Sequence, residues 1–247
     1  MSAVSRRELG QGAEDSSPAD AMTSAEFRSR LAGRAKQAGV AVPDRASELL
    51  EAYFRLLGRW NPRINLTALP LDPPTDVTFD RLFVEPLAAA SFLHRAQTRV
   101  RPGSDPLKWV DLGSGGGSPA IPLKIAQPYW ALTMVESKAR KAAFLKEAAR
   151  SLELKTTAVL SERFETLEPD DADLYNLVTV RGVKVDEMMF EAASRLLRKD
   201  GELAMFRPTV EISRIAGFEH LSTDELGTEA PAFLIRYGRV FHVEQSR

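Results

Sequence analysis

The segment that most constrains the fold is the glycine-rich turn at positions 109–119, which reads WVDLGSGGGSP. An apolar, strand-like stretch leads directly into Gly113, Gly115 and Gly117, and a helical pattern with Pro119 near its first turn follows. Glycine permits positive φ angles and close approach of the backbone to a ligand, and the helix that follows adds free N–H groups. We therefore expect a ligand-binding turn at the carboxyl end of the first strand of an α/β sheet.

The rest of the chain after this turn alternates between strand and helix patterns. Strands are predicted at 107–112, 131–135, 156–160, 174–180, 202–206 and 232–240, and helices at 119–126, 138–152 and 186–198. Asp186 can cap the last of these helices, and Gly201 lies just past its predicted end. Such alternation predicts a mostly parallel sheet with helices on both faces.

The chain before the turn has a different character. Residues 1–22 are small and polar, which predicts a disordered tail, and residues 23–105 form a helical N-terminal region ahead of a domain at 106–247. Within that region we expect one helix that Asn61 and Pro62 end, and a second at 79–94 with Pro86 as a kink or break. Residues 101–106 read as a linker to the sheet.

Composition excludes several classes of site and protein. The chain has no cysteine, which excludes disulfides, zinc-thiolate sites and enzymes with a cysteine nucleophile. Its three histidines are scattered, so we expect no metal site, and no apolar stretch is long enough to predict a membrane span. With 33 Lys and Arg against 34 Asp and Glu, the charge is balanced, although a local basic patch stays compatible with it. We expect a cytoplasmic monomer.

Two carboxylates accompany the glycine turn. Asp111 stands two positions before the first glycine, and Glu136 follows the second predicted strand, where its carboxylate can accept both hydroxyls of a ribose. The spacing is Gly-x-Gly-x-Gly and not the Gly-x-Gly-x-x-Gly of dinucleotide enzymes. The set resembles the S-adenosyl-L-methionine site of Rossmann-type methyltransferases, although a tight turn without a ligand is the alternative. The predicted cofactor-binding residues are Asp111, Gly113, Gly115, Gly117, Ser118, Glu136, Ser137, Lys138, Phe164, Glu165 and Arg181.

Three segments extend the resemblance to one family of methyltransferases. WNPRINLT at 60–67 looks like the W-N-x-x-x-N-L-T signature of the RsmG (GidB) family, and DLGSGGGSPAIPL at 111–123 is similar to its glycine loop. VESKARKAAFL at 135–145 resembles its second strand and basic helix, and Arg181 falls where the family has an arginine after its fourth strand. The resemblance implies a seven-stranded sheet whose last strand is antiparallel. It also implies methyl transfer from S-adenosyl-L-methionine to guanine N7 in 16S ribosomal RNA.

The chain departs from the family pattern mainly in the segments expected to face the target. After the Trp60 signature the family usually reads R-H-x-x-D-S, whereas Arg81 is followed here by Leu82, Glu85 and Pro86. Five further positions also differ: Val180 and Gly182 replace the serine and the alanine of S-R-A, Arg207-Pro208 replaces lysine-glycine, and Ala120 replaces a glycine. Methyl transfer is therefore a firmer prediction than the identity of the methylated base.

The residues also favour guanine N7 by exclusion. Methylation of a pyrimidine C5 usually needs a cysteine, and methylation of an amino group usually needs an N-P-P-Y tract, which Val180-Arg181-Gly182 does not provide. Guanine N7 has an in-plane lone pair and no proton, so positioning and exclusion of water suffice. The expected catalytic residue is Arg181, and the expected RNA-binding residues are Arg81, Lys138, Arg140, Lys141 and Arg207.

Purely structural roles are the alternatives for several of these residues. Phe164 can simply pack in the core, Arg181 can form a surface ion pair with Asp186 or Glu187, and the basic helix can present a solvated face. Two other functions also stay open. One is a nucleotide-dependent oxidoreductase, and the other is a non-catalytic or retargeted paralogue that binds RNA or the small ribosomal subunit.

Overall fold

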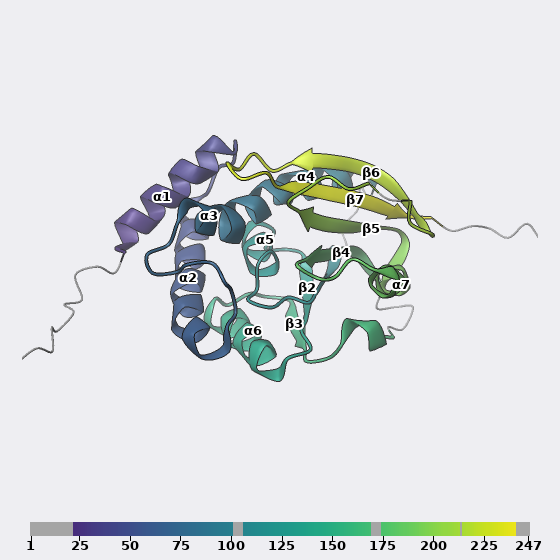
Figure 1. Ribbon diagram of the computed structural model, residues 1–247, viewed down its shortest axis with the longest axis horizontal. Helices are drawn as coiled ribbons and strands as arrows, with labels where there is room; N and C mark the ends of the chain where they lie inside the picture. Colours follow the sequence, from purple (N-terminus) through teal and green to yellow (C-terminus); the bar gives the residue numbers. More distant parts are fainter. Residues whose placement is uncertain (1–21, 101–105, 169–173, 213, 241–247) are drawn as a thin grey trace, which may run out of the picture.

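The computed structural model describes residues 22–100, 106–168, 174–212 and 214–240 (Figure 1). Of the predicted tail and linker, residues 1–21 and 101–105 lie outside these ranges. A twisted sheet forms the middle of the molecule, and helices lie against both of its faces. The first helices gather at one end, beside the glycine turn.

The strands form one seven-stranded sheet in the order β3-β2-β1-β4-β5-β7-β6. Their bounds are β1 Lys108–Leu112, β2 Ala131–Val135, β3 Thr157–Leu160, β4 Tyr175–Arg181, β5 Leu197–Arg207, β6 Phe218–Glu225 and β7 Phe233–Arg239. β1 to β5 pair in parallel, and β7 is antiparallel to both of its neighbours. The predicted fold class and the antiparallel last strand are therefore confirmed.

Helices connect the strands and also precede the sheet. Those before the sheet are α1 Ser24–Gln37, α2 Asp44–Ile64, α3 Asp76–Phe79, the π-helical segment η2 Asp80–Val84 and α4 Glu85–Val100. Those between strands are α5 Ala120–Ala126, α6 Ala139–Ser151, the short 3₁₀ segment η3 Phe164–Thr166 and α7 Glu187–Leu196. Asp186 caps α7 as predicted, because its carboxylate accepts a hydrogen bond from the Met189 N–H.

The structure contradicts the expected end of the first helix at Pro62 and the expected break of the second at Pro86, while a kink at Pro86 stays a prediction. Pro62 does not end α2, which continues to Ile64 and closes on Asn65 in the left-handed conformation with φ 48°. Pro62 lies in the last turn, where the lost N–H disturbs only one helical hydrogen bond. Pro86 does not break the second helix either. It is the second residue of α4 and follows the π-helical turn, and the helical run continues from α3 through η2 into α4.

Side chains alternate between two buried clusters across the sheet. On β5, Leu203 and Met205 join the cluster under α7, whereas Ala204 and Phe206 join the larger cluster on the other face. That larger cluster also contains Phe27 of α1 and side chains of α2, α4, α5 and α6. The helical region and the sheet thus share one core, while the division of the chain at 105/106 stays a prediction.

The structure adds one strand and shifts several predicted boundaries, most of all at the junction of α7 and β5. β6 was not predicted, β5 begins at Leu197 instead of position 202, and α7 ends at Leu196 instead of position 198. Gly201, expected just past the helix, lies inside β5, next to a register shift between β4 and β5.

Candidate active site

The glycine turn follows β1 and has the positive φ angles that its sequence predicts. φ is +69° at Gly113, +53° at Gly115 and +93° at Gly117. A Cβ added at Gly117 would lie 2.5 Å from Ile121 Cδ1, because α5 packs directly on the turn. A Cβ added at Gly115 would meet only the Gly113 carbonyl oxygen, at 3.7 Å. Gly117 therefore serves close packing, and Gly115 borders open space.

Glu136 joins the carboxyl end of β2 to this turn. One of its carboxylate oxygens accepts a hydrogen bond from the Gly115 N–H at 3.0 Å, and the other accepts one from the Lys138 N–H at 2.8 Å. The side chain is buried, yet each carboxylate oxygen has a second lone pair. The carboxylate is thus held in place by the backbone and keeps acceptor capacity for a ligand hydroxyl.

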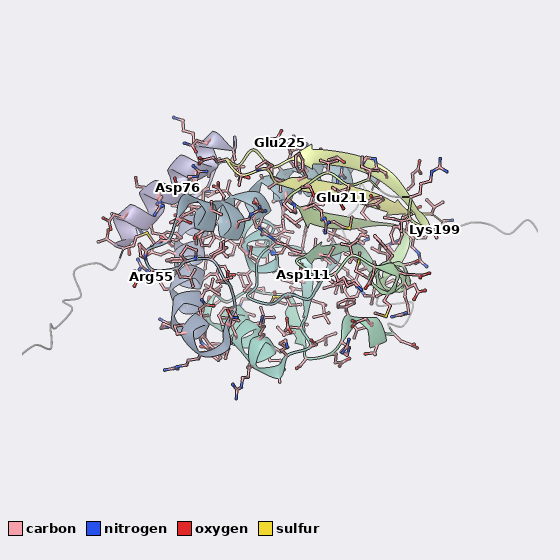
Figure 2. All side chains as sticks on the ribbon, viewed as in Figure 1. Arg55, Asp76, Asp111, Lys199, Glu211 and Glu225 are labelled. Carbon is pink, nitrogen blue, oxygen red and sulfur yellow. The ribbon has the colours of Figure 1, made fainter. Side chains whose placement is uncertain are left out.

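Asp111 lies beneath the turn, near the middle of the molecule (Figure 2). It is 1% exposed, and its carboxylate accepts a 2.5 Å hydrogen bond from the Thr179 hydroxyl, which in turn accepts one from the Trp109 indole N–H. Burial raises the pKa of Asp111 to about 6. This position supports the turn from below, and the predicted contact of Asp111 with the cofactor stays a prediction.

The turn is also held from the side of α2. The Tyr53 hydroxyl donates to the Gly116 carbonyl oxygen at 2.6 Å, and a Cβ added at Gly116 would lie 2.9 Å from the Leu66 carbonyl oxygen. Asn61 shapes the segment after α2, because its side-chain oxygen accepts from the N–H groups of Leu66 and Thr67. The end of the WNPRINLT segment, at Leu66 and Thr67, therefore forms a wall of the site.

Trp60 of the same signature fixes α2 to α6. Its ring lies 5.8 Å from that of Phe144, edge to face, so Trp60 packs the helical region against a helix that follows β2. Sequence reasoning missed Tyr53, because its place in the apolar stripe of α2 indicated only packing.

Arg181 stands at the carboxyl end of β4, and its guanidinium points toward the π-helical segment. Nη2 donates to Glu85 Oε2 at 2.5 Å, and Nη1 donates to the Arg81 carbonyl oxygen at 2.6 Å and to Ser118 Oγ at 3.2 Å. Asp186 pairs with Lys184 instead, so the alternative of a surface ion pair between Arg181 and Asp186 is wrong. Sequence reasoning treated Glu85 only as a departure from the family pattern.

A cavity of about 370 Å³ opens between these elements. Its lining combines the glycine turn, the segment after α2, η2 and the carboxyl ends of β4 and β5. The lining residues are Tyr53, Leu57, Leu66, Thr67, Leu69, Arg81, Leu82, Gly116, Ser118, Arg181, Gly182, Phe206 and Pro208. The cavity is mostly apolar with a few polar groups, which is typical of a small-molecule site. Three departures from the family pattern, Leu82, Gly182 and Pro208, lie in this one lining.

The predicted adenine side lies at the other edge of the turn. β3 ends beside Glu136, whose N–H donates to the Leu160 carbonyl oxygen at 3.1 Å. Phe164 packs against the cluster under α7, as the packing alternative expected, and the Glu165 carbonyl oxygen accepts from Arg195 at 2.7 Å. The role of Phe164 and Glu165 in cofactor binding stays a prediction.

The predicted RNA-binding residues fall into two groups. Arg81 lines the cavity, and Arg207 at the end of β5 lies 3.6 Å from Glu211. Lys138, Arg140 and Lys141 instead line a separate groove of about 490 Å³ between the end of α2 and the start of α6. Arg63 lines the same groove from α2 and was not predicted. No acidic side chain among the residues that the structure describes pairs with these four cations.

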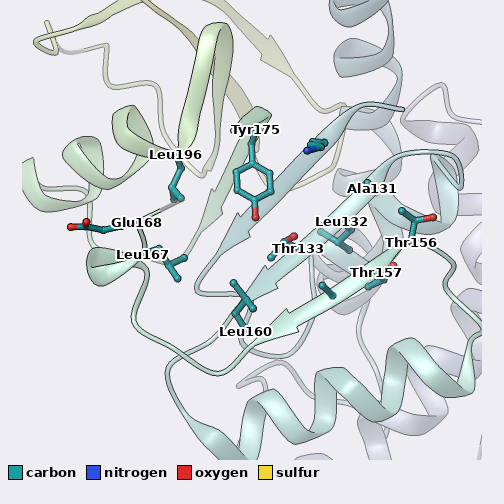
Figure 3. A pocket seen from close by; sticks show the side chains of 12 residues that line it. Ala131, Leu132, Thr133, Thr156, Thr157, Leu160, Leu167, Glu168, Tyr175 and Leu196 are labelled. Carbon is teal, nitrogen blue, oxygen red and sulfur yellow. The ribbon is translucent and has the colours of Figure 1, made fainter. Parts of the chain in front are cut away.

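A larger hollow of about 560 Å³ lies elsewhere, near the amino ends of β1 to β4 (Figure 3). Lys108, Ala131, Thr157 and Tyr175 belong to its lining, and no predicted site residue does. In parallel sheets, ligands bind at the carboxyl ends of the strands, so this hollow is not the candidate active site.

The sheet order, the antiparallel β7 and the glycine turn after β1 define the fold of Rossmann-type, S-adenosylmethionine-dependent methyltransferases. The family model of GidB, rRNA small subunit methyltransferase G, matches residues 46–222, and the chain belongs to this family.

Named relatives agree with this assignment, and a solved structure is similar in fold. The protein named ribosomal RNA small subunit methyltransferase G from Pseudomonas entomophila is 35% identical over 140 residues, which cover 57% of this chain and 59% of that protein. Its namesake from Stenotrophomonas maltophilia is 34% identical over 209 residues, 82% of this chain and 87% of that protein. A crystal structure of a mutant of MtNAS matches with a TM-score of 0.50 and 11% identity, over 85% of this chain and 86% of that chain, and is similar in fold alone.

None of the described helices is long and apolar enough to cross a membrane.

Proposed function

We propose that the protein transfers a methyl group from S-adenosyl-L-methionine to N7 of a guanine in 16S ribosomal RNA. The observation that carries this proposal is the glycine turn, which is tied to Glu136 on one side and opens into a cavity on the other. A donor and an acceptor can therefore meet at one turn.

The residues around the turn fit this cofactor. The Glu136 carboxylate is held by two backbone N–H groups and retains lone pairs for a ribose diol, while Gly115 leaves space beside it. Below the turn, ionised Asp111 supplies negative charge for a cationic amino group, at close range or through water. When bound, S-adenosyl-L-methionine supplies a methyl group activated by a sulfonium.

The cavity suits the acceptor base. Sheet order places β2 with Glu136 on one side of β1, and β4 and β5, which end at the cavity, on the other. Apolar side chains such as Leu66 and Phe206 can exclude water and pack on a purine, and Arg181 can donate to guanine O6 without withdrawing the N7 lone pair. No side chain needs to remove a proton, so orientation is the chain's contribution to the rate.

The groove of Arg63, Lys138, Arg140 and Lys141 gives the RNA backbone a path to the site. Three of these cations lie at the start of α6, where the helix dipole disfavours positive charge and the first turn of the helix contains no acidic residue. A polyanion relieves this repulsion, and phosphate contacts of this kind dominate affinity for nucleic acid. We infer that the partner is 16S ribosomal RNA or the small subunit, and that a monomer acts in the cytoplasm.

The test is transfer of labelled methyl from the cofactor to 16S RNA and to small subunits from bacteria that lack their own family member. Nucleoside analysis should find the label in 7-methylguanosine. Label in another nucleoside would refute the N7 assignment. Cofactor binding without transfer to either substrate would favour the second candidate, a non-catalytic or retargeted RNA-binding paralogue. That candidate is motivated by Leu82, Gly182 and Pro208, which all line the cavity.

A further inference from the structure

Glu85 is a buried carboxylate that lies between two arginines beside the cavity. Its side chain is 1% exposed, Oε2 lies 2.5 Å from Arg181 Nη2, and Oε1 lies 3.2 Å from Arg81 Nη1. The Oε1 contact lacks hydrogen-bond geometry, so Arg181 is the closer and better-oriented partner. Two cations therefore share one anion at the wall of the cavity.

The backbone next to Glu85 supplies a second acceptor for the same guanidinium. In η2 the Glu85 N–H donates to the Asp80 carbonyl oxygen, five residues back, as in a π-helix. It therefore does not donate to the Arg81 carbonyl oxygen, which would be its acceptor in an α-helix. The next residue that could donate to the Arg81 carbonyl oxygen in this register is Pro86, which has no N–H. The Arg81 carbonyl oxygen instead accepts from Arg181 Nη1 at 2.6 Å and, over a longer distance, from Ser118 Oγ at 3.3 Å.

The same proline also affects the contact between this segment and the glycine turn. Pro86 is the α-helical donor position for the Leu82 carbonyl oxygen, and that oxygen instead accepts from Ser118 Oγ at 3.0 Å. Ser118 Oγ is also 3.2 Å from Arg181 Nη1. The segment from Arg81 to Pro86 thus contacts both the end of β4 and the glycine turn.

We propose that Glu85 is a positioning residue for methyl transfer, which, with the carbonyl oxygen that Pro86 leaves free, fixes the Arg181 guanidinium at the acceptor cavity. This inference rests on the proposed function, in which Arg181 orients the acceptor. A buried ion pair is a weak source of stability, because desolvation offsets its attraction. Two acceptors in fixed directions instead hold the planar guanidinium in one orientation.

The test compares Glu85→Gln, Arg181→Gln and the double variant in single-turnover methyl transfer at saturating cofactor. Glutamine keeps the shape of Glu85 and removes its charge. We expect Glu85→Gln to lower the transfer rate by about tenfold to a hundredfold, the scale of a misplaced group. Its effect on the dissociation constant of S-adenosylhomocysteine should be under about threefold.

The double variant should be no slower than Arg181→Gln alone, because Glu85 acts through Arg181. Exposed Glu48→Gln is the matched control.

A merely structural role gives a different pattern. The two substitutions would then lower the transfer rate additively and in step with the melting temperature, and that result would overturn the proposal. Unchanged transfer by folded Glu85→Gln would overturn it as well. If Glu85→Gln does not fold, Glu85→Asp retracts the same charge by one methylene and should give an intermediate rate.

Pro86→Ala tests the role of the backbone acceptor in this proposal, because it restores an N–H that competes for the Arg81 carbonyl oxygen. It should slow transfer by about threefold, whereas Pro43→Ala at the start of α2 should not. Equal rates for the two proline variants would remove Pro86 from the proposal.

An NMR readout separates this inference from the proposed function. The Nε–H signal of Arg181, assigned by its loss in Arg181→Gln, should be sharp in the wild type and broadened or shifted in Glu85→Gln. If the wild type transfers no methyl to RNA, the proposed function fails, yet this signal still tests the positioning. An unchanged signal in Glu85→Gln would overturn the positioning itself.

Discussion

The two edges of the candidate active site are built differently. Toward β2, the ligand surface is mostly backbone: glycines with positive φ, and a carboxylate held by the N–H groups of Gly115 and Lys138. Toward β4 and β5, it is mostly side chains contributed by five separate elements, including Tyr53, Leu82 and Arg181. Backbone geometry tolerates little change in sequence, whereas a wall of side chains can be replaced residue by residue.

Most departures from the family pattern follow this difference, and Ala120, which begins α5 after the glycine turn, is an exception. Leu82, Gly182 and Pro208 lie in the cavity, and Glu85 and Pro86 lie immediately behind it. At the β2 edge, Gly113, Gly115, Gly117 and Glu136 all match. We expect variation of this kind to change what the cavity accepts and to leave cofactor binding intact, so the two edges should respond separately to substitution.

The largest effect is expected for Gly115→Val. Its side chain would occupy the open space beside Glu136, and we expect affinity for S-adenosylhomocysteine to fall by at least about a hundredfold, from steric exclusion. Gly39→Val is the control, because Gly39 also has a positive φ and open surroundings. Both variants should lose about 1–2 kcal/mol of stability from backbone strain, and calorimetry should find lost binding only in the first. Retained binding in Gly115→Val would move the cofactor away from this turn.

Asp111→Asn should change how stability depends on pH. Burial raises the pKa of Asp111 from 3.8 to about 6, so between these values the folded protein holds a proton that the unfolded chain has released. Stability therefore falls as pH rises through this window, and the full cost of about 3 kcal/mol is present above it. Denaturant titrations at pH 4 and pH 7 should show that Asp111→Asn gains stability relative to the wild type as pH rises. A constant difference between the two proteins would contradict the shifted pKa.

Sequence reasoning located the β2 edge well because its signals are local. The glycine spacing and Glu136 follow predicted strands directly, and the predicted bounds of β2 agree with the structure. β6 was missed because its sequence, FEHLSTDE, belongs to a polar edge strand with only Phe218 buried. The early start of β5 was missed because Gly201 and Asp200 read as a helix end, whereas tertiary pairing with β4 extends the strand.

The cavity edge could be predicted only in part. Arg181 was placed by its position after a strand, but its partner Glu85 is 96 residues away in the chain. Tyr53 could not be predicted for the same reason, since nothing in the neighbouring sequence indicates its hydrogen bond to the Gly116 carbonyl oxygen. Such contacts depend on how the helical region packs on the sheet, and helical periodicity does not encode that arrangement.

Glu136→Ala should lower the affinity for S-adenosylhomocysteine by a smaller factor than Gly115→Val. Loss of a carboxylate that binds hydroxyls costs about 1.5–3 kcal/mol of binding free energy. It also leaves the Gly115 and Lys138 N–H groups without their acceptor. Glu136→Gln keeps one acceptor oxygen and should lose less. Transfer measured at saturating cofactor should recover in both variants, and a defect that persists there would place Glu136 in acceptor positioning as well.

The basic groove should control the salt dependence of RNA binding. Replacing Lys138, Arg140 and Lys141 by alanine should reduce the slope of log K against log salt by about two, if each cation neutralises one phosphate. Arg63→Ala should reduce it by about one or less. Alanine at three exposed lysines outside the groove, Lys36, Lys155 and Lys199, is the control. Equal slopes for the two triple variants would mean that α6 only presents a solvated face.

The smallest effect is expected for Leu82→His. This variant also tests most directly whether the cavity edge and the cofactor edge respond separately to substitution. Leu82 is 4% exposed, belongs to the larger buried cluster and lines the cavity, so an imidazole there replaces apolar contact with a polar ring beside two guanidiniums. We expect methyl transfer to fall by about threefold, under 1 kcal/mol in barrier, with the affinity for S-adenosylhomocysteine unchanged. Leu82→Met conserves volume and should transfer at the wild-type rate. Equal losses of transfer and cofactor affinity in Leu82→His would mean that the cavity and the cofactor site are one continuous pocket. A gain in transfer would instead identify Leu82 as a residue that changed the target, because histidine is the family's usual residue at this position.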